Sequence, residues 1–256
     1  MNKNLAILQA APTGRFFVDY LLYRGYVMKR LKALFMMAVC VSLMGIGPIL
    51  GKNDFGKKVD SSYNILCFKN NLLVGSGSGN HFKVRGTPFV TTAAHVVDTC
   101  DTVAVVEGNG EVYQLDLVII DILVDWAVLK PKRPLLLPPA KFYRKSIDVG
   151  DRVDMLAWPS DYGMIYAEGM ISGHRNLSIY IQTFCWLGSS GAAVFTDEGA
   201  FVGLVHGIKV GWYDPAMPPQ LLNGMCLVRP MTNISDIEIY EAVRSYDGGE
   251  ARYLIH

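Results

Sequence analysis

The stretch TPFVTTAAHVVD, residues 87–98, places a histidine directly after a short apolar strand. Thr87–Thr92 contains the β-branched and aromatic residues that favour strands. Similar short runs continue on both sides of it, separated by turns with Gly, Asn, Asp and Pro. Twelve runs are predicted as strands: Tyr63–Phe68, Asn71–Gly75, Thr87–Thr92, Thr102–Val106, Val112–Asp121, Ala127–Lys130, Arg152–Ala157, Met164–Ser172, Ile179–Thr183, Ala192–Thr196, Phe201–Lys209 and Met225–Val228. Many short strands of this kind predict an all-β barrel or sandwich.

Two features complete the predicted organisation of this β region. The Pro-rich stretch Pro131–Pro139 is predicted to join two halves, at about residues 59–133 and 140–234. After them, apolar residues recur at helical spacing within Ser235–Tyr246, and Ser235 suits the N-cap position. A short amphipathic helix over residues 235–246 is therefore expected to close the domain.

Residues 1–58 are predicted to be an N-terminal extension with a hydrophobic helix. Residues 33–50 read ALFMMAVCVSLMGIGPIL and carry no charge. A helix of that length, at about 1.5 Å per residue, just crosses a hydrocarbon core of roughly 30 Å. Lys29, Arg30 and Lys32 precede it and favour a cytoplasmic N-terminal side. A single-pass membrane anchor, a signal segment and a buried core helix stay open. The first two predict a membrane-anchored or secreted chain.

Composition excludes several classes of partner and cofactor. Lys and Arg total 24 and Asp and Glu total 23, so net charge gives no reason to expect nucleic acid. The cysteines show neither CxxC spacing nor a metal-ligand pattern with histidine, and we predict no metal and no cofactor. They are interpreted as mostly free and buried, although disulfides stay possible if the domain is lumenal. The cysteines are Cys40, Cys67, Cys100, Cys185 and Cys226.

Three short motifs carry residues that acyl transfer by serine requires. His95 ends TTAAH, Asp125 begins DWAVL, and Ser190 lies in GSSG. A serine hydroxyl becomes an effective nucleophile when a neutral imidazole takes its proton, and a carboxylate holds that imidazole in the right tautomer. Taken alone, each residue has an ordinary interpretation as a core histidine, a turn aspartate or a loop serine. Their order on one β background predicts a catalytic triad.

The glycine before the predicted nucleophile suits a second requirement of this chemistry. A tetrahedral oxyanion needs backbone N–H donors, and glycine tolerates the backbone angles that present them. The candidate donors are the N–H groups of Gly188 and Ser190, with Ser189 as a further candidate.

TTAAHVVD (91–98), DWAVLK (125–130) and GSSGAAVF (188–195) resemble the three catalytic blocks of chymotrypsin-like serine peptidases. GSGSGNHF (75–82) resembles the segment before the histidine block in HtrA-type and viral members. The resemblance covers about Val59 to Arg244. It implies two six-stranded antiparallel β-barrels within a peptidase domain at 59–256, with the active site between them. It also implies that His95 is the general base, Asp125 the orienting carboxylate and Ser190 the nucleophile.

The chain departs from the family pattern around the nucleophile. Ser189 stands where most members have Asp or Asn, which excludes zymogen activation by an N-terminal amine paired with an aspartate there. Ala192 follows Gly191 where a second glycine is usual. The disulfide that often flanks the histidine block is not evident, and no PDZ-like region is recognisable after the peptidase region.

The resemblance also places the primary specificity pocket between residues 184–187 and 204–210. The candidate substrate-binding residues are Cys185, His206 and Lys209. In some viral relatives a histidine on this strand selects Glu or Gln before the scissile bond, and His206 is offset from it by a residue or two. Lys209 is the alternative, as a residue that favours an acidic substrate side chain.

The predicted function is hydrolysis of peptide bonds by a serine endopeptidase, through an acyl-enzyme intermediate. Its partners are polypeptide substrates and, through the N-terminal segment, a membrane. One form of this hypothesis is a viral processing protease. The alternatives are an HtrA-like quality-control peptidase without a PDZ domain and an inactive pseudopeptidase that serves as a binding module.

Overall fold

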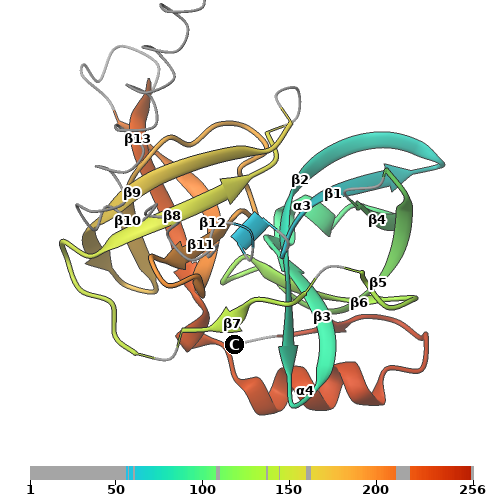
Figure 1. The fold of residues 1–256 in the computed structure, drawn as a ribbon. Coiled ribbons are helices and arrows are strands. Elements are labelled where there is room, and N and C mark those ends of the chain that lie inside the picture. Colours follow the sequence, from blue (N-terminus) through green and yellow to red (C-terminus); the bar gives the residue numbers. More distant parts are fainter. Residues whose placement is uncertain are drawn as a thin grey trace, which may run out of the picture. The chain divides into compact units, whose positions relative to one another are not determined.

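The computed structural model describes residues 56, 58–59, 61–107, 110–136, 138–143, 145–159, 163–211 and 220–254. The predicted hydrophobic helix at residues 33–50 lies outside these ranges. Within them, no helix combines the length and the apolar character that a membrane crossing requires. The described part consists mainly of two β-barrels (Figure 1).

Six antiparallel strands form the first barrel, in the order β5-β4-β1-β2-β3-β6, and pairing of β5 with β6 closes it. The strands are β1 (Ser62–Lys69), β2 (Leu72–Val84), β3 (Thr87–Thr92), β4 (Thr102–Val106), β5 (Val112–Asp121) and β6 (Trp126–Pro131). A two-residue strand near the C-terminus, β14 (Arg252–Tyr253), adds to β5 in parallel.

The second barrel repeats this plan, in the order β11-β8-β9-β10-β13-β12, with β11 pairing to β12. Its strands are β8 (Arg152–Ala157), β9 (Ile165–Arg175), β10 (Ser178–Gln182), β11 (Ala193–Thr196), β12 (Ala200–Gly211) and β13 (Gln220–Pro230). The short β7 (Lys141–Phe142) lies in the connection between the barrels and pairs with β12 in parallel. The predicted fold class, two six-stranded antiparallel barrels, is confirmed.

Short helical elements accompany the barrels in the described part of the chain, among them α3 (Ala94–Val97), the 3-10 helix η1 (Met231–Asn233) and α4 (Asp236–Ser245). The Ser235 hydroxyl accepts a hydrogen bond from the Glu238 N–H, as expected of an N-cap. Helix α4 buries Ile239 and Val243. The predicted C-terminal helix is therefore present, one residue shorter at each end.

One buried hydrophobic cluster joins the two barrels. Phe82 and Phe89 enter it from the first barrel, Phe195 and Phe201 from the second, and Ile239 from α4. Burial of a large apolar side chain contributes about 1.5–3 kcal/mol each. This shared core fixes the barrels against each other, so side chains contributed by different barrels keep a defined geometry.

The structure corrects the interpretation of the cysteines as free. Cys67 on β1 pairs with Cys100, which follows the histidine block in sequence, and Cys185 pairs with Cys226 in the second barrel. The partners are 33 and 41 residues apart in sequence, but their Cα atoms lie 5.3 and 5.9 Å apart. Pairing of β1 with β4 and of β10 with β13 brings them together, which spacing alone cannot show. The first bridge also supplies the disulfide near the histidine block that the sequence did not reveal.

Strand β2 is longer than predicted and includes the glycines of GSGSG. A Cβ at Gly77 would lie 2.8 Å from Val96, and one at Gly79 would lie 2.7 Å from Ile65. Glycine is needed here because other elements pack closely against the strand, and such glycines resemble a loop in sequence. The two-residue strands β7 and β14 were not predicted, since they exist only through their partners.

Candidate active site

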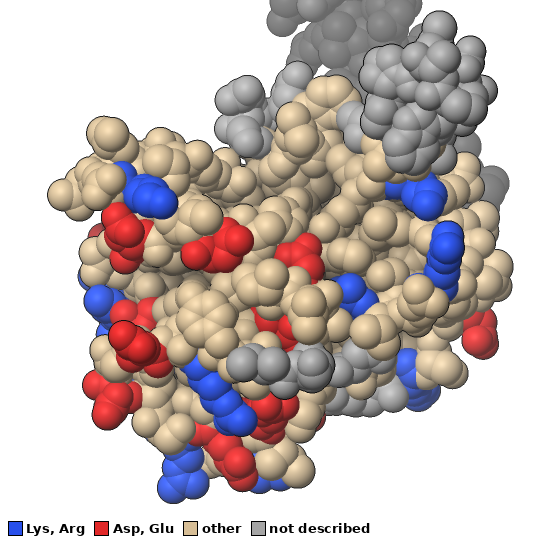
Figure 2. Space-filling model, turned by 180° about the vertical axis from the view of Figure 1, so that it is seen from behind, with Lys and Arg blue, Asp and Glu red and all other residues tan. Residues whose placement is uncertain are grey.

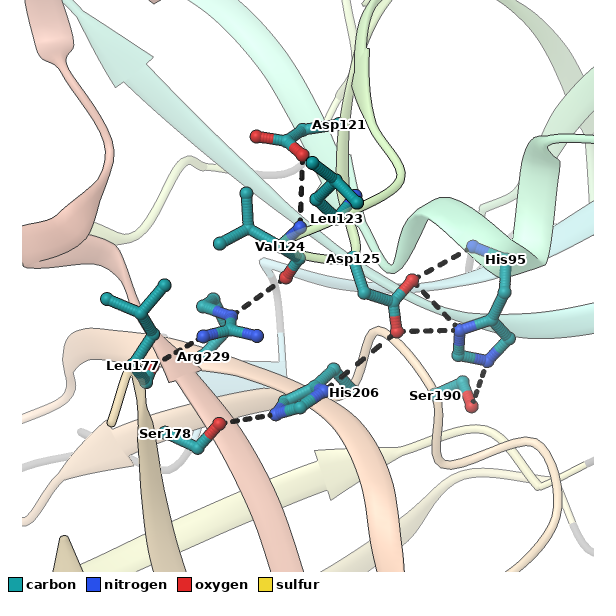
Figure 3. Close-up of polar contacts among 10 residues, drawn as sticks. All are labelled: His95, Asp121, Leu123, Val124, Asp125, Leu177, Ser178, Ser190, His206 and Arg229. Atoms are coloured by element: carbon teal, nitrogen blue, oxygen red, sulfur yellow. Dashed lines mark hydrogen bonds and ion pairs between the residues drawn. The ribbon is translucent and has the colours of Figure 1, made fainter. Parts of the chain in front are cut away.

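The predicted triad residues meet where the two barrels join (Figure 3). His95 lies in α3 directly after β3, Asp125 in the β5–β6 turn, and Ser190 just before β11. His95 Nε2 lies 2.7 Å from Ser190 Oγ. His95 Nδ1 lies 2.8 Å from Asp125 Oδ2 and 3.0 Å from Oδ1. This is the arrangement in which an imidazole can take a hydroxyl proton while a carboxylate orients it.

Strand pairing explains why His95 lies beside Asp125. Strands β3 and β6 are antiparallel, and Thr92 at the end of β3 pairs with Ala127 at the start of β6. The residues just beyond Thr92 and just before Ala127 therefore emerge at the same end of the barrel. The His95 backbone N–H donates to Asp125 Oδ1 at 3.0 Å, so Asp125 holds both the main chain and the ring of His95.

The turn that carries Asp125 has an unusual backbone conformation. Asp125 has φ +58°, in the left-handed region that Asp and Asn enter more readily than most residues. The Asp121 carboxylate accepts hydrogen bonds from the N–H groups of Leu123 and Val124, both at 3.0 Å. These bonds organise the turn immediately before the Asp125 carboxylate.

The loop around Ser190 is held by Ser78, a fully buried residue of β2 in the other barrel. The Ser78 N–H donates to the Ser190 carbonyl at 2.8 Å. Its hydroxyl donates to the Gly188 carbonyl at 3.0 Å and accepts from the Trp158 N–H at 2.8 Å. No sequence motif identified Ser78, whose signal in the sequence is its place between the two close-packed glycines of GSGSG.

The three candidate oxyanion donors beside Ser190 differ in their hydrogen bonds. Gly188 has φ +90°, as expected for a residue that turns its N–H group toward the site. The Ser189 N–H donates instead to the Trp186 carbonyl at 2.9 Å, and Ser189 Oγ accepts from the Trp186 N–H at 3.1 Å. The Ser189 N–H is therefore occupied within this turn, which favours the other two candidates as oxyanion donors. Among the described residues, no hydrogen bond occupies the N–H of Gly188 or Ser190, so these two remain the candidates.

The charges of the site suit a general base. The hydrogen bond to Asp125 raises the pKa of His95 above its ordinary 6.5, although burial opposes this. Burial alone would raise the pKa of Asp125, but the hydrogen bonds from the His95 ring and backbone outweigh it and lower that pKa. Asp125 thus stays ionised and stabilises the imidazolium that forms when His95 accepts a proton.

The three predicted substrate-binding residues have different surroundings in the structure. Cys185 is buried in its disulfide. Lys209 lies partly buried on β12. His206, also on β12, turns toward the triad: its Nδ1 lies 4.0 Å from Asp125 Oδ2, and its Nε2 lies 3.0 Å from Ser178 Oγ. Burial, followed by the nearby Arg229 charge, lowers the pKa of His206 to about 4. These contacts place His206 beside the Asp125 carboxylate, and the role of His206 in substrate choice stays a prediction.

Exposed apolar side chains lie just before the nucleophile. The Phe184 and Trp186 rings are stacked, with centroids 6.5 Å apart, and Leu187 is 71% exposed. These three residues, called here the apolar shelf, precede Gly188 directly. Large exposed apolar groups beside a reactive centre are suited to bind apolar parts of a ligand.

The described residues contain no group of three or more His, Cys, Asp or Glu side chains placed to hold a metal ion. Figure 2 shows cationic and anionic side chains interspersed over one face of the molecule. On that face, the two signs of charge alternate without a continuous track of either.

Known proteins resemble the chain over the region that carries this site. A family profile described as "Trypsin-like peptidase domain" matches residues 77–204, which include all three predicted triad residues. Serine endoprotease DegS of Haemophilus influenzae is 29% identical over 129 residues, covering 45% of this chain and 37% of DegS. DegS of Escherichia coli is 28% identical over 138 residues, covering 50% of this chain and 38% of the relative. The chain thus spans less than two fifths of the length of these curated relatives.

Solved structures share the fold. A serine endoprotease from Yersinia pestis superposes with a TM-score of 0.61 at 21% identity, over 76% of this chain and 68% of the other. The HtrA-type protease AlgW, solved with a tripeptide, gives the same TM-score and identity, over 76% of this chain and 63% of AlgW. At this identity the likeness concerns the fold.

Proposed function

The chain belongs to the trypsin-like peptidase domain family, and we propose that it is a serine endopeptidase that cleaves polypeptides with His95, Asp125 and Ser190. The observation that carries the proposal is the continuous contact from Ser190 Oγ to His95 Nε2, at 2.7 Å, and from His95 Nδ1 to Asp125 Oδ2, at 2.8 Å. The family supplies the expectation of peptidase chemistry, and the contacts supply residues able to perform it.

In the proposed reaction, Ser190 Oγ attacks the carbonyl carbon of the scissile bond while its proton passes to His95 Nε2. The negative charge that develops on the carbonyl oxygen is stabilised by the Gly188 and Ser190 N–H groups. Asp125 stabilises the resulting imidazolium. His95 then gives its proton to the leaving amine as the C–N bond breaks, which leaves an acyl-enzyme on Ser190. Water, deprotonated by His95, repeats the sequence and releases the acid.

Covalent labelling with a fluorophosphonate probe tests this proposal directly. The wild-type protein should be labelled and should hydrolyse an unfolded protein substrate, whereas Ser190→Ala should do neither. Ser245→Ala, a change on the exposed side of α4, is the matched control and should behave as wild type. A folded wild-type protein that is neither labelled nor active would favour the inactive binding module instead.

Among the forms that a serine endopeptidase can take, we propose an HtrA-like peptidase acting on exposed apolar segments, in preference to a viral processing protease. The named relatives are bacterial serine endoproteases, and the apolar shelf of Phe184, Trp186 and Leu187 lies beside the nucleophile. Profiling with a peptide library should show a preference for apolar residues before the scissile bond. A preference for Glu or Gln there would instead support the specificity role of His206 and the viral form.

We also propose that residues 33–50 attach the chain to a membrane or direct its export. The support is the uncharged run of residues and the basic residues immediately before it. Alkaline extraction of membranes should leave an anchored protein in the pellet. Recovery in the soluble fraction with residues 1–50 still present would refute both membrane attachment and export by a signal segment. Recovery of a shortened soluble chain would support cleavage of a signal segment.

A further inference from the structure

One buried and one partly buried side chain of the second barrel reach the turn that carries Asp125 (Figure 3). Arg229, on β13, is 6% exposed. Its Nε donates to the Val124 carbonyl at 2.8 Å, and its Nη1 donates to the Leu177 carbonyl at 2.7 Å. His206, on β12, lies between Ser178 and Asp125 through the contacts given above. Each side chain therefore connects the β9–β10 turn of the second barrel with the Asp125 turn of the first.

The bond from Arg229 acts on the peptide that orients Asp125. The Val124 carbonyl and the Asp125 N–H belong to one planar peptide unit, so fixing that carbonyl fixes the plane from which Asp125 projects. The Asp121 carboxylate holds the N–H groups of Leu123 and Val124, which lie earlier in the turn. The Val124 carbonyl receives its hydrogen bond from the opposite barrel.

This peptide needs support because Asp125 adopts φ +58°. A non-glycine residue in the left-handed region is strained and persists when its surroundings determine it. A hydrogen bond from a charged donor is stronger than one between neutral groups. Arg229 can therefore offset the strain of the catalytic turn.

The charges of the two side chains complement this geometry. Burial lowers the pKa of Arg229, and the nearby charge of Asp125 opposes this, as expected of an attraction between the guanidinium and an ionised carboxylate. The His206 ring stays neutral, because burial and the Arg229 charge both lower its pKa. A neutral ring 4.0 Å from Asp125 Oδ2 contacts the carboxylate without competing, as a cation would, for the negative charge that His95 requires.

We propose that Arg229 and His206 are positioning residues for the proposed peptidase reaction, acting together through the placement of Asp125 against His95. The inference rests on the proposed function. The competing explanation is a purely structural role, in which the two side chains only join the barrels. The positioning role and the structural role predict different kinetic results.

Steady-state kinetics of the purified full chain provide the first test. Arg229→Met removes the donors and the charge, and Arg229→Lys restores the charge without the two-pronged donor geometry. We expect Arg229→Met to lower kcat about 10- to 100-fold with KM nearly unchanged, since a displacement of about 1 Å at a catalytic group costs up to roughly 100-fold. Arg229→Lys should recover part of the loss.

His206→Phe should lower kcat by less, because the ring makes no close hydrogen bond to Asp125. Arg152→Met, on the exposed β8 side chain, is the matched control and should leave kcat unchanged.

A double-mutant cycle distinguishes positioning from general stabilisation. In an Asp125→Asn background, Arg229→Met should change kcat less than twofold, because the carboxylate that it positions is already gone. A loss of equal size in both backgrounds, or an unchanged kcat in the single variant, would overturn the inference. If Arg229→Met does not fold, the same cycle run with Arg229→Lys and His206→Phe decides the matter. A wild-type chain without Ser190-dependent hydrolysis would instead count against the proposed function.

Discussion

Ser78 joins the nucleophile loop to the other barrel, and replacing it with alanine tests whether that link controls the oxyanion site. The substitution removes one hydroxyl at a fully buried position. Its loss leaves the Gly188 carbonyl without a donor at 3.0 Å and the Trp158 N–H without an acceptor at 2.8 Å. The backbone bond from the Ser78 N–H to the Ser190 carbonyl remains, so the loop should loosen without detaching.

The size of the effect follows from these two partners. A buried polar group left unsatisfied costs about 1–3 kcal/mol, so two of them should lower the free energy of unfolding by roughly 2–6 kcal/mol. For a domain of about 200 residues, where 1 kcal/mol corresponds to about 2–4 °C, Tm should fall by roughly 4–24 °C. The Gly188 carbonyl and the Ser189 N–H share one peptide unit, so turning of this carbonyl disturbs the loop between the two oxyanion donors. Since loss of one such donor costs about 100- to 1000-fold in kcat, a partial disturbance should cost at least about tenfold.

Thermal unfolding followed by circular dichroism measures the first quantity, and initial rates of peptide hydrolysis measure the second. Ser172→Ala is the control, because its hydroxyl makes one exposed hydrogen bond to the Tyr180 carbonyl. The reasoning is refuted if Ser78→Ala melts within about 1 °C of wild type and keeps its full kcat.

Further predictions concern the triad, the disulfides and the nucleophile loop. Only neutral His95 can act as base, so kcat/KM should rise with pH through a midpoint above 6.5. In Asp125→Asn, that midpoint should move to lower pH while kcat falls by about 10⁴-fold; a midpoint that stays in place would contradict the assigned cause. Replacing both Cys67 and Cys100 with alanine should lower the free energy of unfolding by about 3–4 kcal/mol in chemical denaturation, because the bridge closes a long loop. Equal stability with and without the pair would mean that the bridge does not form. Gly191→Ala should yield no folded, active protein, since its Cβ would lie 2.0 Å from a backbone oxygen and φ is +80°; soluble, fluorophosphonate-reactive protein would contradict this.

The sequence predicted those features that depend on local pattern. Alternating apolar residues and turn residues located most of the strands, and Ser235 marked the start of the last helix at its N-cap. His95, Asp125 and Ser190 were identifiable because each lies in a short motif beside a strand end. Strand β2 was predicted too short because GSGSG has the composition of a loop, and its glycines are required by packing that the sequence does not show.

Interactions between distant segments were not predictable in the same way. Ser189 looked like an oxyanion donor by position, but its N–H completes a turn with Trp186. His206 looked like a substrate-selecting residue by its place on a strand, yet its ring lies beside Asp125 and Ser178. In both cases the orientation of one group decided its contacts, and strand position constrains that orientation weakly.

By itself, the sequence determined that this chain is an all-β protein with a serine, a histidine and an aspartate in peptidase-like motifs, because strand propensity, turns and short motifs are local properties. The pairing of the cysteines, the turn that the Ser189 N–H closes, and the reach of Ser78 and Arg229 from one barrel to the other became visible only in three dimensions. The contacts of Ser78 and Arg229 depend on packing of the two barrels against one shared core. This packing places residues separated by about a hundred positions within hydrogen-bond distance, as Arg229 and Val124 show, and no local pattern encodes such a distance.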